Sequence, residues 1–235
     1  MENDLKEPLF EVQEKKQKRV LSFFEIMTLP RSGFGIISVF VCYFAFSYNT
    51  PILNNHLLKL DYSPSFFGAA ISMAAFFFAV AIPVIGKMTV RMNKRGVIFL
   101  GFLIQVSGVI ITGMDECLGY YNPGFFVVLG LSIFGFGTAM ISIPIMPEAL
   151  EGVENKYNDY NEFILENNIS GYYVTFQGIG ETMGPMTSSI LEKYLELQWT
   201  QYTLGLIVLA FISAYVMGCG LTNFFFGDHL TKKTE

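Results

Sequence analysis

The sequence has few of the residues that build covalent, metal or catalytic sites. It contains three cysteines, two histidines and one tryptophan among 235 residues. Cys42, Cys117 and Cys219 show no CxxC or cysteine–histidine spacing, so they indicate neither a disulfide framework nor a zinc site. His56 and His229 are too isolated in the sequence to form a metal site. We therefore expect no metal and no cofactor.

Enzyme motifs are also absent. The sequence has no GxSxG or HExxH motif, no phosphate-binding glycine loop and no paired carboxylates inside its apolar runs. The stretch "GIGETMG" at 178–184 is rich in glycine, but it lies within a mostly uncharged run with no strand pattern before it. We expect neither an enzymatic activity nor a nucleic-acid partner.

What the sequence does have is long apolar runs with almost no charge. It is 52% hydrophobic with 24 phenylalanines, and its mean hydropathy is +0.44, which is too apolar for a typical soluble domain. Runs of roughly 18 to 25 residues match the length of a helix that crosses a bilayer. They predict an all-α membrane protein with six transmembrane helices, at 33–53, 66–86, 97–114, 124–147, 169–191 and 202–226.

Six crossings divide the chain into a polar tail at 1–31, a six-helix domain at 32–227 and a short tail at 228–235. They also put thirteen Lys and Arg residues on the side of both termini and only Lys59 and Lys193 on the other. The positive-inside rule then places both termini in the cytosol. We expect a multi-pass protein of the plasma membrane or of a vesicle or vacuole membrane.

Two cytosolic segments have their own patterns. The loop at 148–168 is acidic and rich in asparagine, so we expect it to be exposed and mobile. Basic residues followed by Leu21, Phe23, Phe24, Ile26 and Met27 fit a short amphipathic segment on the cytosolic membrane face. An ordinary linker explains this second segment equally well.

Glu181 is the exception to the uncharged runs. A charge in the middle of a transmembrane helix costs about 2.5–3.5 kcal/mol on insertion scales, so it needs a reason. Helical spacing places it on one face with Ser170, Tyr173, Gln177, Gly184 and Ser188. This face suggests a substrate or proton pathway, to which Asn49 and Tyr43 of the first run are candidate additions. The alternative is that these groups form hydrogen bonds between helices that hold the bundle together.

Small residues and prolines accompany this carboxylate. Gly180 and Gly184 form a GxxxG pair, which allows two helices to approach closely. Pro185 follows directly, and Pro144 lies near the end of the fourth run. Prolines in transmembrane helices free backbone carbonyls and permit bends, so we expect these two to bend their helices.

The stretch "GKMTVRMNKRG" at 86–96 resembles the cytosolic loop motif of the major facilitator superfamily, Gly-x-x-x-Asp-Arg-x-Gly-Arg-Lys/Arg. Gly86, Arg91, Lys94 and Arg95 match it, whereas Val90 replaces the aspartate and Asn93 the second glycine. This departure is typical of the second half of such transporters, and it argues against a charge-relay gate here.

Two longer stretches support this resemblance. "NTPILNNHLLKLDYSPSFFGAAISM" at 49–73 and "ISGYYVTFQGIGETMGPMTSSIL" at 169–191 are similar to the C-terminal half of transporters in the vesicular amine and polyamine branch. The polar tail before Arg31 resembles the central loop between the halves. The resemblance implies twelve helices in two halves, with the first and fourth helices of this half lining a cavity and the second and fifth at the interface.

The resulting hypothesis is one half of a proton-coupled secondary transporter of a small organic molecule or cation. It works by alternating access, with membrane lipid, a small-molecule substrate, and an N-terminal half or a second copy as partners. The alternative is a non-transporting half that acts as a membrane scaffold or regulator of a full transporter.

Overall fold

The computed structural model describes residues 20–114, 123–157, 160–195 and 197–219. Each of the six apolar runs corresponds to one long helix: α2 (Pro30–Lys59), α3 (Pro64–Arg91), α4 (Lys94–Thr112), α6 (Pro123–Glu154), α7 (Glu162–Leu191) and α8 (Leu197–Cys219). A short helix, α1 (Phe23–Met27), precedes them within the polar tail. The described residues contain no β-strand, as the run lengths predict.

Several residues and segments named in the sequence analysis cannot be compared with the structure, because they lie outside the described residues. The start of the polar tail at 1–19, Cys117 with its neighbours at 115–122, and the segment 220–235 lie outside the described residues. The end of the sixth run and the C-terminal tail, with His229, belong to that last segment.

Local sequence signals mark several helix starts. Proline stands at the first position of α2 and α3, where its missing N–H would have no partner in any case. Ser63 caps α3 by accepting a hydrogen bond from the N–H of Phe66 at 3.3 Å. Asn93 caps α4 in the same way through the N–H of Arg95 at 3.2 Å. Only Met92 and Asn93 separate α3 from α4, so most of the basic stretch at 86–96 is helical.

Five helices are long and apolar enough to cross a membrane: α2, α3, α4, α6 and α8. These five indicate a multi-pass membrane protein. Helix α7 has 30 residues, as many as α2, but it contains no continuous stretch apolar enough to place it in this set. Helix α7 is not apolar enough because it carries the Tyr173, Gln177 and Glu181 series together with several threonines and glycines.

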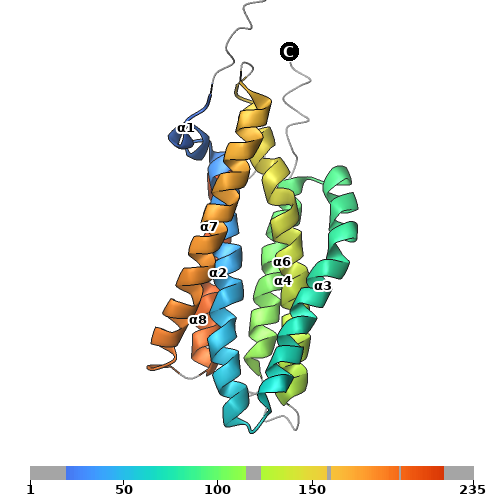
Figure 1. Ribbon diagram of the computed structural model, residues 1–235, viewed down its shortest axis with the longest axis vertical. Helices are drawn as coiled ribbons and strands as arrows, with labels where there is room; N and C mark the ends of the chain where they lie inside the picture. Colours follow the sequence, from blue (N-terminus) through green and yellow to red (C-terminus); the bar gives the residue numbers. More distant parts are fainter. Residues whose placement is uncertain (1–19, 115–122, 158–159, 196, 220–235) are drawn as a thin grey trace, which may run out of the picture.

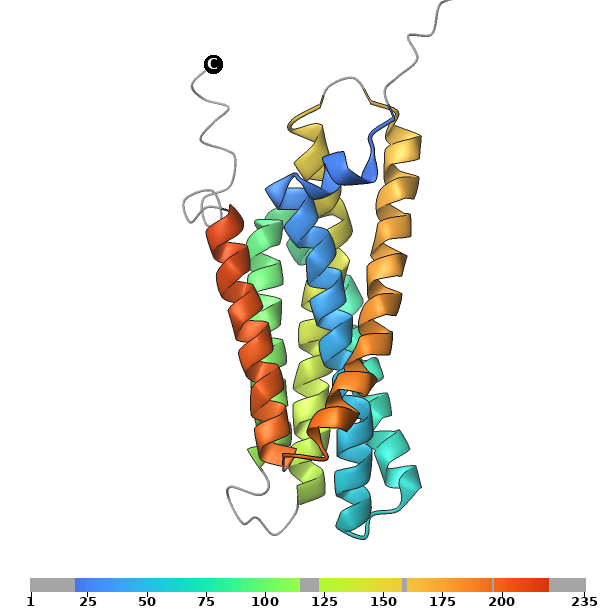
Figure 2. The same cartoon turned by 90° about the vertical axis from the view of Figure 1, so that its left-hand side faces the viewer.

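The helices form two layers. α7, α2, α6 and α3 pack side by side in that order, and α8 and α4 lie behind them, against α2 and α6 respectively. Figure 1 shows α7 and α3 at opposite edges of the first layer. α1 and the last turn of α8 lie at the same end of the bundle (Figure 2), since six long helices run back and forth between them.

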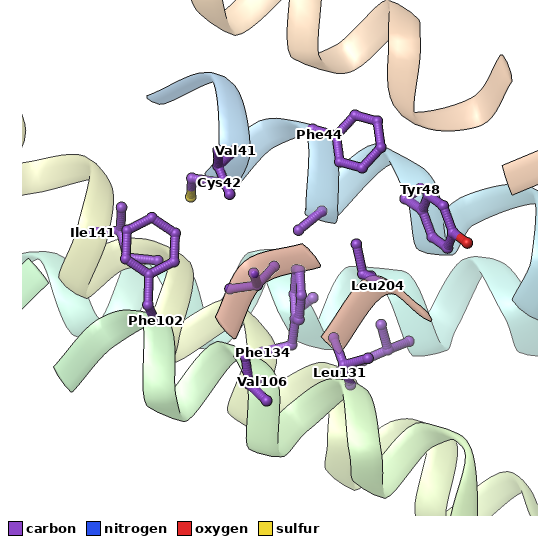
Figure 3. Packing of buried hydrophobic residues seen from close by; sticks show 14 of the residues in the cluster. Val41, Cys42, Phe44, Tyr48, Phe102, Val106, Leu131, Phe134, Ile141 and Leu204 are labelled. Atoms are coloured by element: carbon purple, nitrogen blue, oxygen red, sulfur yellow. The ribbon is translucent and has the colours of Figure 1, made fainter. Parts of the chain in front are cut away.

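Glycine makes the tightest contact between the layers possible. A Cβ on Gly108 of α4 would meet the Gly130 carbonyl at 2.8 Å, and one on Gly101 would meet the Gly137 carbonyl at 3.1 Å. Helices α4 and α6 therefore touch backbone to backbone. Around this contact, large side chains of α2, α4, α6 and α8 fill the interior, among them Tyr48, Phe102, Phe134 and Leu204 (Figure 3).

The structure differs from the sequence-based expectation at the segment 148–168. Instead of one exposed loop, α6 continues to Glu154 and α7 already begins at Glu162. The last turns of α6 are largely buried because they pack in a second cluster at this end of the bundle. That cluster contains Leu21, Ile26, Leu29, Ile36, Ala149, Val153, Leu165 and Ile169.

Candidate functional site

Glu181 lies on the outside of the bundle, in the second half of α7. Its side chain is exposed, and the Gln177 amide donates a hydrogen bond of 2.9 Å to its carboxylate. Gln177 and Tyr173 precede it by four and eight residues, so all three lie along one side of the helix. The two earlier side chains are half-buried, so they turn further toward the bundle than Glu181 does.

The GxxxG pair sets the orientation of α7. A Cβ on Gly180 would lie 2.6 Å from the Phe40 carbonyl oxygen, and one on Gly184 would lie 2.7 Å from the Phe44 carbonyl oxygen. Both glycines therefore face α2 at backbone contact, where no larger residue fits. Glu181, one residue after Gly180, is consequently turned out of the bundle, level with the middle of α2.

Tyr173 connects α7 to the first predicted cavity helix. Its hydroxyl lies 3.3 Å from the hydroxyl of Tyr43 on α2, and the two rings meet edge to face at 6.4 Å. Helices α2 and α7 thus meet at one pair of tyrosines, and both members of the pair are residues that the sequence hypothesis selected.

Ser142 of α6 belongs to a separate group of polar side chains in the core. Its hydroxyl lies 3.8 Å from the Cys42 thiol, and the Gln105 amide on α4 donates to the Thr138 hydroxyl at 3.2 Å. Gln105 also donates weakly to the Cys42 carbonyl, at 3.4 Å. The four side chains are buried, and Cys42 lies among large apolar groups (Figure 3). They form hydrogen bonds between helices, which is the structural alternative raised from the sequence.

The other predicted residues occupy separate places. Asn49 is buried in α2 and donates to the Ala45 carbonyl at 2.8 Å, a bond within its own helix. Among the contacts of the described residues, none joins it to Glu181. Pro144 is buried inside α6, and Pro185 is half-buried inside α7 directly after the glycine that touches α2.

A buried group of charges lies at the end of the bundle where α2 and α4 begin. Glu148 is fully buried and accepts hydrogen bonds from Arg31 at 2.5 Å and from Arg95 at 2.8 Å. Arg31 also bonds Glu151 at 2.5 Å, and Lys94 pairs with Glu151. This ion-pair cluster (Arg31, Lys94, Arg95, Glu148, Glu151) joins the ends of α2, α4 and α6.

The loop motif is therefore divided in space. Lys94 and Arg95 belong to the ion-pair cluster, whereas Arg91 is exposed at the end of α3. A Cβ on Gly86 would meet open space, so nothing packed against that position requires a glycine. Val90, which replaces the aspartate of the motif, is 86% exposed, so that position lies outside the ion-pair cluster.

Sequence reasoning missed most of the ion-pair cluster. It assigned Arg31 only to the count of cytosolic positive charges, and it placed Glu148 and Glu151 in a mobile loop. One signal was available: Glu148 directly follows the apolar run 124–147, and Arg31 lies just before the run 33–53. Opposite charges at the ends of neighbouring helices can meet, but only the fold shows that these helices are neighbours.

Metal binding finds no support in the part of the chain that the structure describes. No group of histidine, cysteine, aspartate or glutamate side chains there is arranged to hold a metal ion. Comparison with known proteins finds no matching protein family and no matching curated protein.

Proposed function

We propose that this chain is a six-helix half of a secondary transporter, resembling the C-terminal half in the major facilitator superfamily. In this proposal it moves a small organic molecule by proton-coupled alternating access, and a cation is the natural counterpart of Glu181. The observation that carries the proposal is the exposed carboxylate of Glu181, which is level with the middle of α2 in an apolar helical bundle.

Lipid is a poor neighbour for this part of the molecule. A charged group facing the middle of the bilayer is costly, and intramembrane carboxylates face protein or water-filled cavities. The exposed residues around Glu181 are mixed: Thr175 and Thr182 lie among apolar side chains such as Ile179 and Met183, so this face is more polar than the leucine-rich surface that lipid favours. We infer that a second membrane unit covers α7 and leaves an aqueous cavity beside Glu181.

Helix α3, at the other edge of the same layer, supports the same conclusion. Only 22% of its most apolar stretch is buried, the lowest value among the five candidate spans. Its exposed residues include Gly68, Ala69, Ser72 and Ala75, which are small enough to let another helix approach closely at this end, whereas larger apolar residues such as Phe76 and Val84 are exposed further along. A partner that rests on both α3 and α7 leaves α2 and α6 between them to line the cavity.

The residues then have distinct roles. Glu181 binds the proton, or pairs with a cationic substrate, and Gln177 holds its carboxylate through the 2.9 Å hydrogen bond. Tyr43 and Tyr173 present hydroxyls and rings at the junction of α2 and α7, and ring faces attract organic cations. The ion-pair cluster fastens α2, α4 and α6 together, so this half can rock as one body.

Substrate uptake into membrane vesicles tests the proposal. Vesicles are prepared from the chain's native cells, in which each variant replaces the endogenous chain, so that any natural partner is present. A pH gradient drives uptake of radiolabelled spermidine or tetraethylammonium. Glu181→Gln should reduce uphill uptake at least about 100-fold, as expected when a group essential to proton transfer is removed. Glu166→Gln is the matched control, because Glu166 is an exposed carboxylate on the same helix, outside the predicted span.

Each outcome has a definite meaning. Loss of uptake in Glu181→Gln alone supports the proposal. Equal uptake by the wild type and Glu181→Gln overturns the role of Glu181. Equal uptake with and without the chain overturns transport itself and favours a scaffold. Western blots of the vesicles must show equal amounts of each variant, since otherwise a folding defect would mimic loss of transport.

A further inference from the structure

A group of polar side chains lies deep inside the bundle and takes no part in the proposed transport. This core polar group consists of Cys42 on α2, Gln105 on α4, and Thr138 and Ser142 on α6. Cys42 is 0% exposed and Gln105 1%, and large apolar side chains of the main cluster lie around Cys42 (Figure 3). Because bulk water does not reach these side chains, any hydrogen bond that they leave unmade costs free energy of folding.

Gln105 is the side chain with an unmade hydrogen bond. Its NH₂ group donates to the Thr138 hydroxyl oxygen at 3.2 Å and to the Cys42 carbonyl at 3.4 Å. Its carbonyl oxygen, Oε1, is buried, and no donor of the described residues lies within hydrogen-bond distance of it. A buried amide oxygen is normally paired, either with protein or with an ordered water. The core polar group therefore contains one strong acceptor that the described protein atoms leave unpaired.

Rotation of the Gln105 amide by 180° does not supply a donor. It would turn Oε1, in place of the NH₂ group, toward the Cys42 carbonyl and the Thr138 hydroxyl. The Cys42 carbonyl is itself an acceptor, and Thr138 already donates its hydrogen to the Phe134 carbonyl at 2.9 Å. Oxygens would then face Oε1 without a hydrogen between them. The observed orientation is the favourable one, so the donor for Oε1 has to come from a bound molecule.

The absence of charge from the core polar group determines what kind of molecule fits. A cation would need a carboxylate nearby, since a buried charge without a partner is costly. All four side chains of the group are neutral, and the buried carboxylate of Glu148 lies at the end of the bundle with two arginines of its own. Water is small and neutral and has two hydrogens to donate. Buried waters held by about three polar groups are a regular part of folded proteins.

Ser142 offers such a water a second contact. On the same helix, Ser132 and Thr138 donate to the carbonyl four residues earlier, at 2.7 and 2.9 Å. The Ser142 hydroxyl lies 3.8 Å from the Cys42 thiol, which is a long contact with a weak partner, so it keeps hydrogen-bonding capacity. The Cys42 sulfur is also 3.7 Å from the Gln105 amide nitrogen. Cys42 thus lies close to both polar groups that a water would use.

We propose that the core polar group binds one ordered water molecule, which donates a hydrogen bond to Gln105 Oε1 and contacts Ser142 beside the Cys42 thiol. The site is separate from Glu181, because it lies in the interior of the bundle whereas Glu181 lies on the outside. The proposal has a chemical consequence: a thiol that is closed to bulk solvent has a water molecule as its neighbour.

Radiolytic labelling of Cys42 tests the site. A brief X-ray pulse splits water into hydroxyl radicals, which oxidise a sulfur atom next to that water, and mass spectrometry measures the oxidised peptides. Native membranes are exposed, and the full chain is purified from them afterwards. Met140 of α6 is the buried control, because it is 2% exposed within an apolar cluster. Met92, 54% exposed between α3 and α4, shows that the dose is sufficient.

We expect Cys42 of the wild type to be labelled at least about fivefold more than Met140, after correction for the greater reactivity of a thiol, because the bound water supplies the radical at the site. Gln105→Leu removes the acceptor at similar side-chain size and should reduce Cys42 labelling to the level of Met140. Thr138→Val is the matched control. It removes a hydroxyl from the same group but keeps Gln105 Oε1, so Cys42 labelling should persist.

Three results would overturn the proposal. If Cys42 of the wild type is labelled as little as Met140, no water is bound beside it, and this comparison holds even where a variant fails to fold. If Cys42 is labelled equally in the wild type and Gln105→Leu, Gln105 does not hold the water. If labelling is lost in Thr138→Val as well as in Gln105→Leu, the packing of the group, and not the Gln105 oxygen, positions the water. Circular dichroism of each purified variant checks that its helices are intact.

Discussion

At the scale of single residues, the most consequential side chain is Glu148. It is 1% exposed and shared between two arginines, Arg31 and Arg95, whose own side chains are 17% and 6% exposed. A buried ion pair adds little net stability compared with a well-packed apolar pair, but removal of one partner leaves uncompensated charge in a region of low dielectric. Glu148 is the partner whose loss leaves the most charge behind, because it serves both arginines.

Glu148→Gln should therefore lower the free energy of unfolding by about 3–5 kcal/mol, the range for breaking a buried pair. Glu166→Gln, at an exposed carboxylate of α7, should change it by less than about 0.5 kcal/mol. The two variants are compared by the temperature at which the detergent-solubilised protein loses its monodisperse elution peak. Equal temperatures would mean that the ion-pair cluster does not stabilise the fold.

At the scale of helices, the contact between α2 and α7 depends on the absence of side chains. Gly184 is buried, and a methyl group there would lie 2.7 Å from the Phe44 carbonyl oxygen and 2.8 Å from the Tyr48 nitrogen. Both atoms belong to the backbone, so neither can move aside without shifting a turn of α2. Gly178, on the same helix, has open space around its Cβ position.

Gly184→Ala should destabilise the protein by about 1–3 kcal/mol, as forced overpacking does. Gly178→Ala should be neutral or stabilising by up to about 1 kcal/mol, since alanine is the better helix former. Thermal unfolding of the two variants in the same detergent checks the difference. If Gly178→Ala is as harmful as Gly184→Ala, α7 does not pack on α2 through these two glycines.

These helices also show what could be predicted from the sequence. The runs at 66–86 and 97–114 correspond to α3 and α4. They could be predicted because a helix that crosses a bilayer must be long and uncharged, and both properties can be read from the local sequence. The extension of α6 to Glu154 could not be predicted in this way. Its last turns are held by the contacts of Glu148 with Arg31 and of the Ala149 carbonyl with Ser32 at 2.8 Å, which link positions 117 residues apart. The contact of Tyr43 with its partner on α7 likewise depends on which helices are neighbours.

At the scale of the whole molecule, the outer surfaces of the helices differ in character. Helix α8 turns large apolar side chains outward, such as Leu206 at 67% and Met217 at 77% exposure, and these suit lipid. Helix α7 also exposes apolar side chains, such as Val174 at 65% and Met186 at 62%, but between them it turns Glu181 outward, and a carboxylate does not suit lipid. This one exposed carboxylate supports the proposal that another membrane unit covers the side of α7, whereas lipid covers the side of α8.

Cross-linking from single cysteines distinguishes the two sides. In a background without the native cysteines, Thr182→Cys on α7 should cross-link to a partner in native membranes, whereas Leu206→Cys on α8 should not, because lipid surrounds it. A bifunctional maleimide joins the chains, and gel mobility compares the products with the 26.4 kDa of the chain. A product of twice this mass that contains only this chain identifies a second copy as the partner, and a mixed product identifies another chain. Cross-linking from Leu206→Cys alone would refute the half-transporter arrangement.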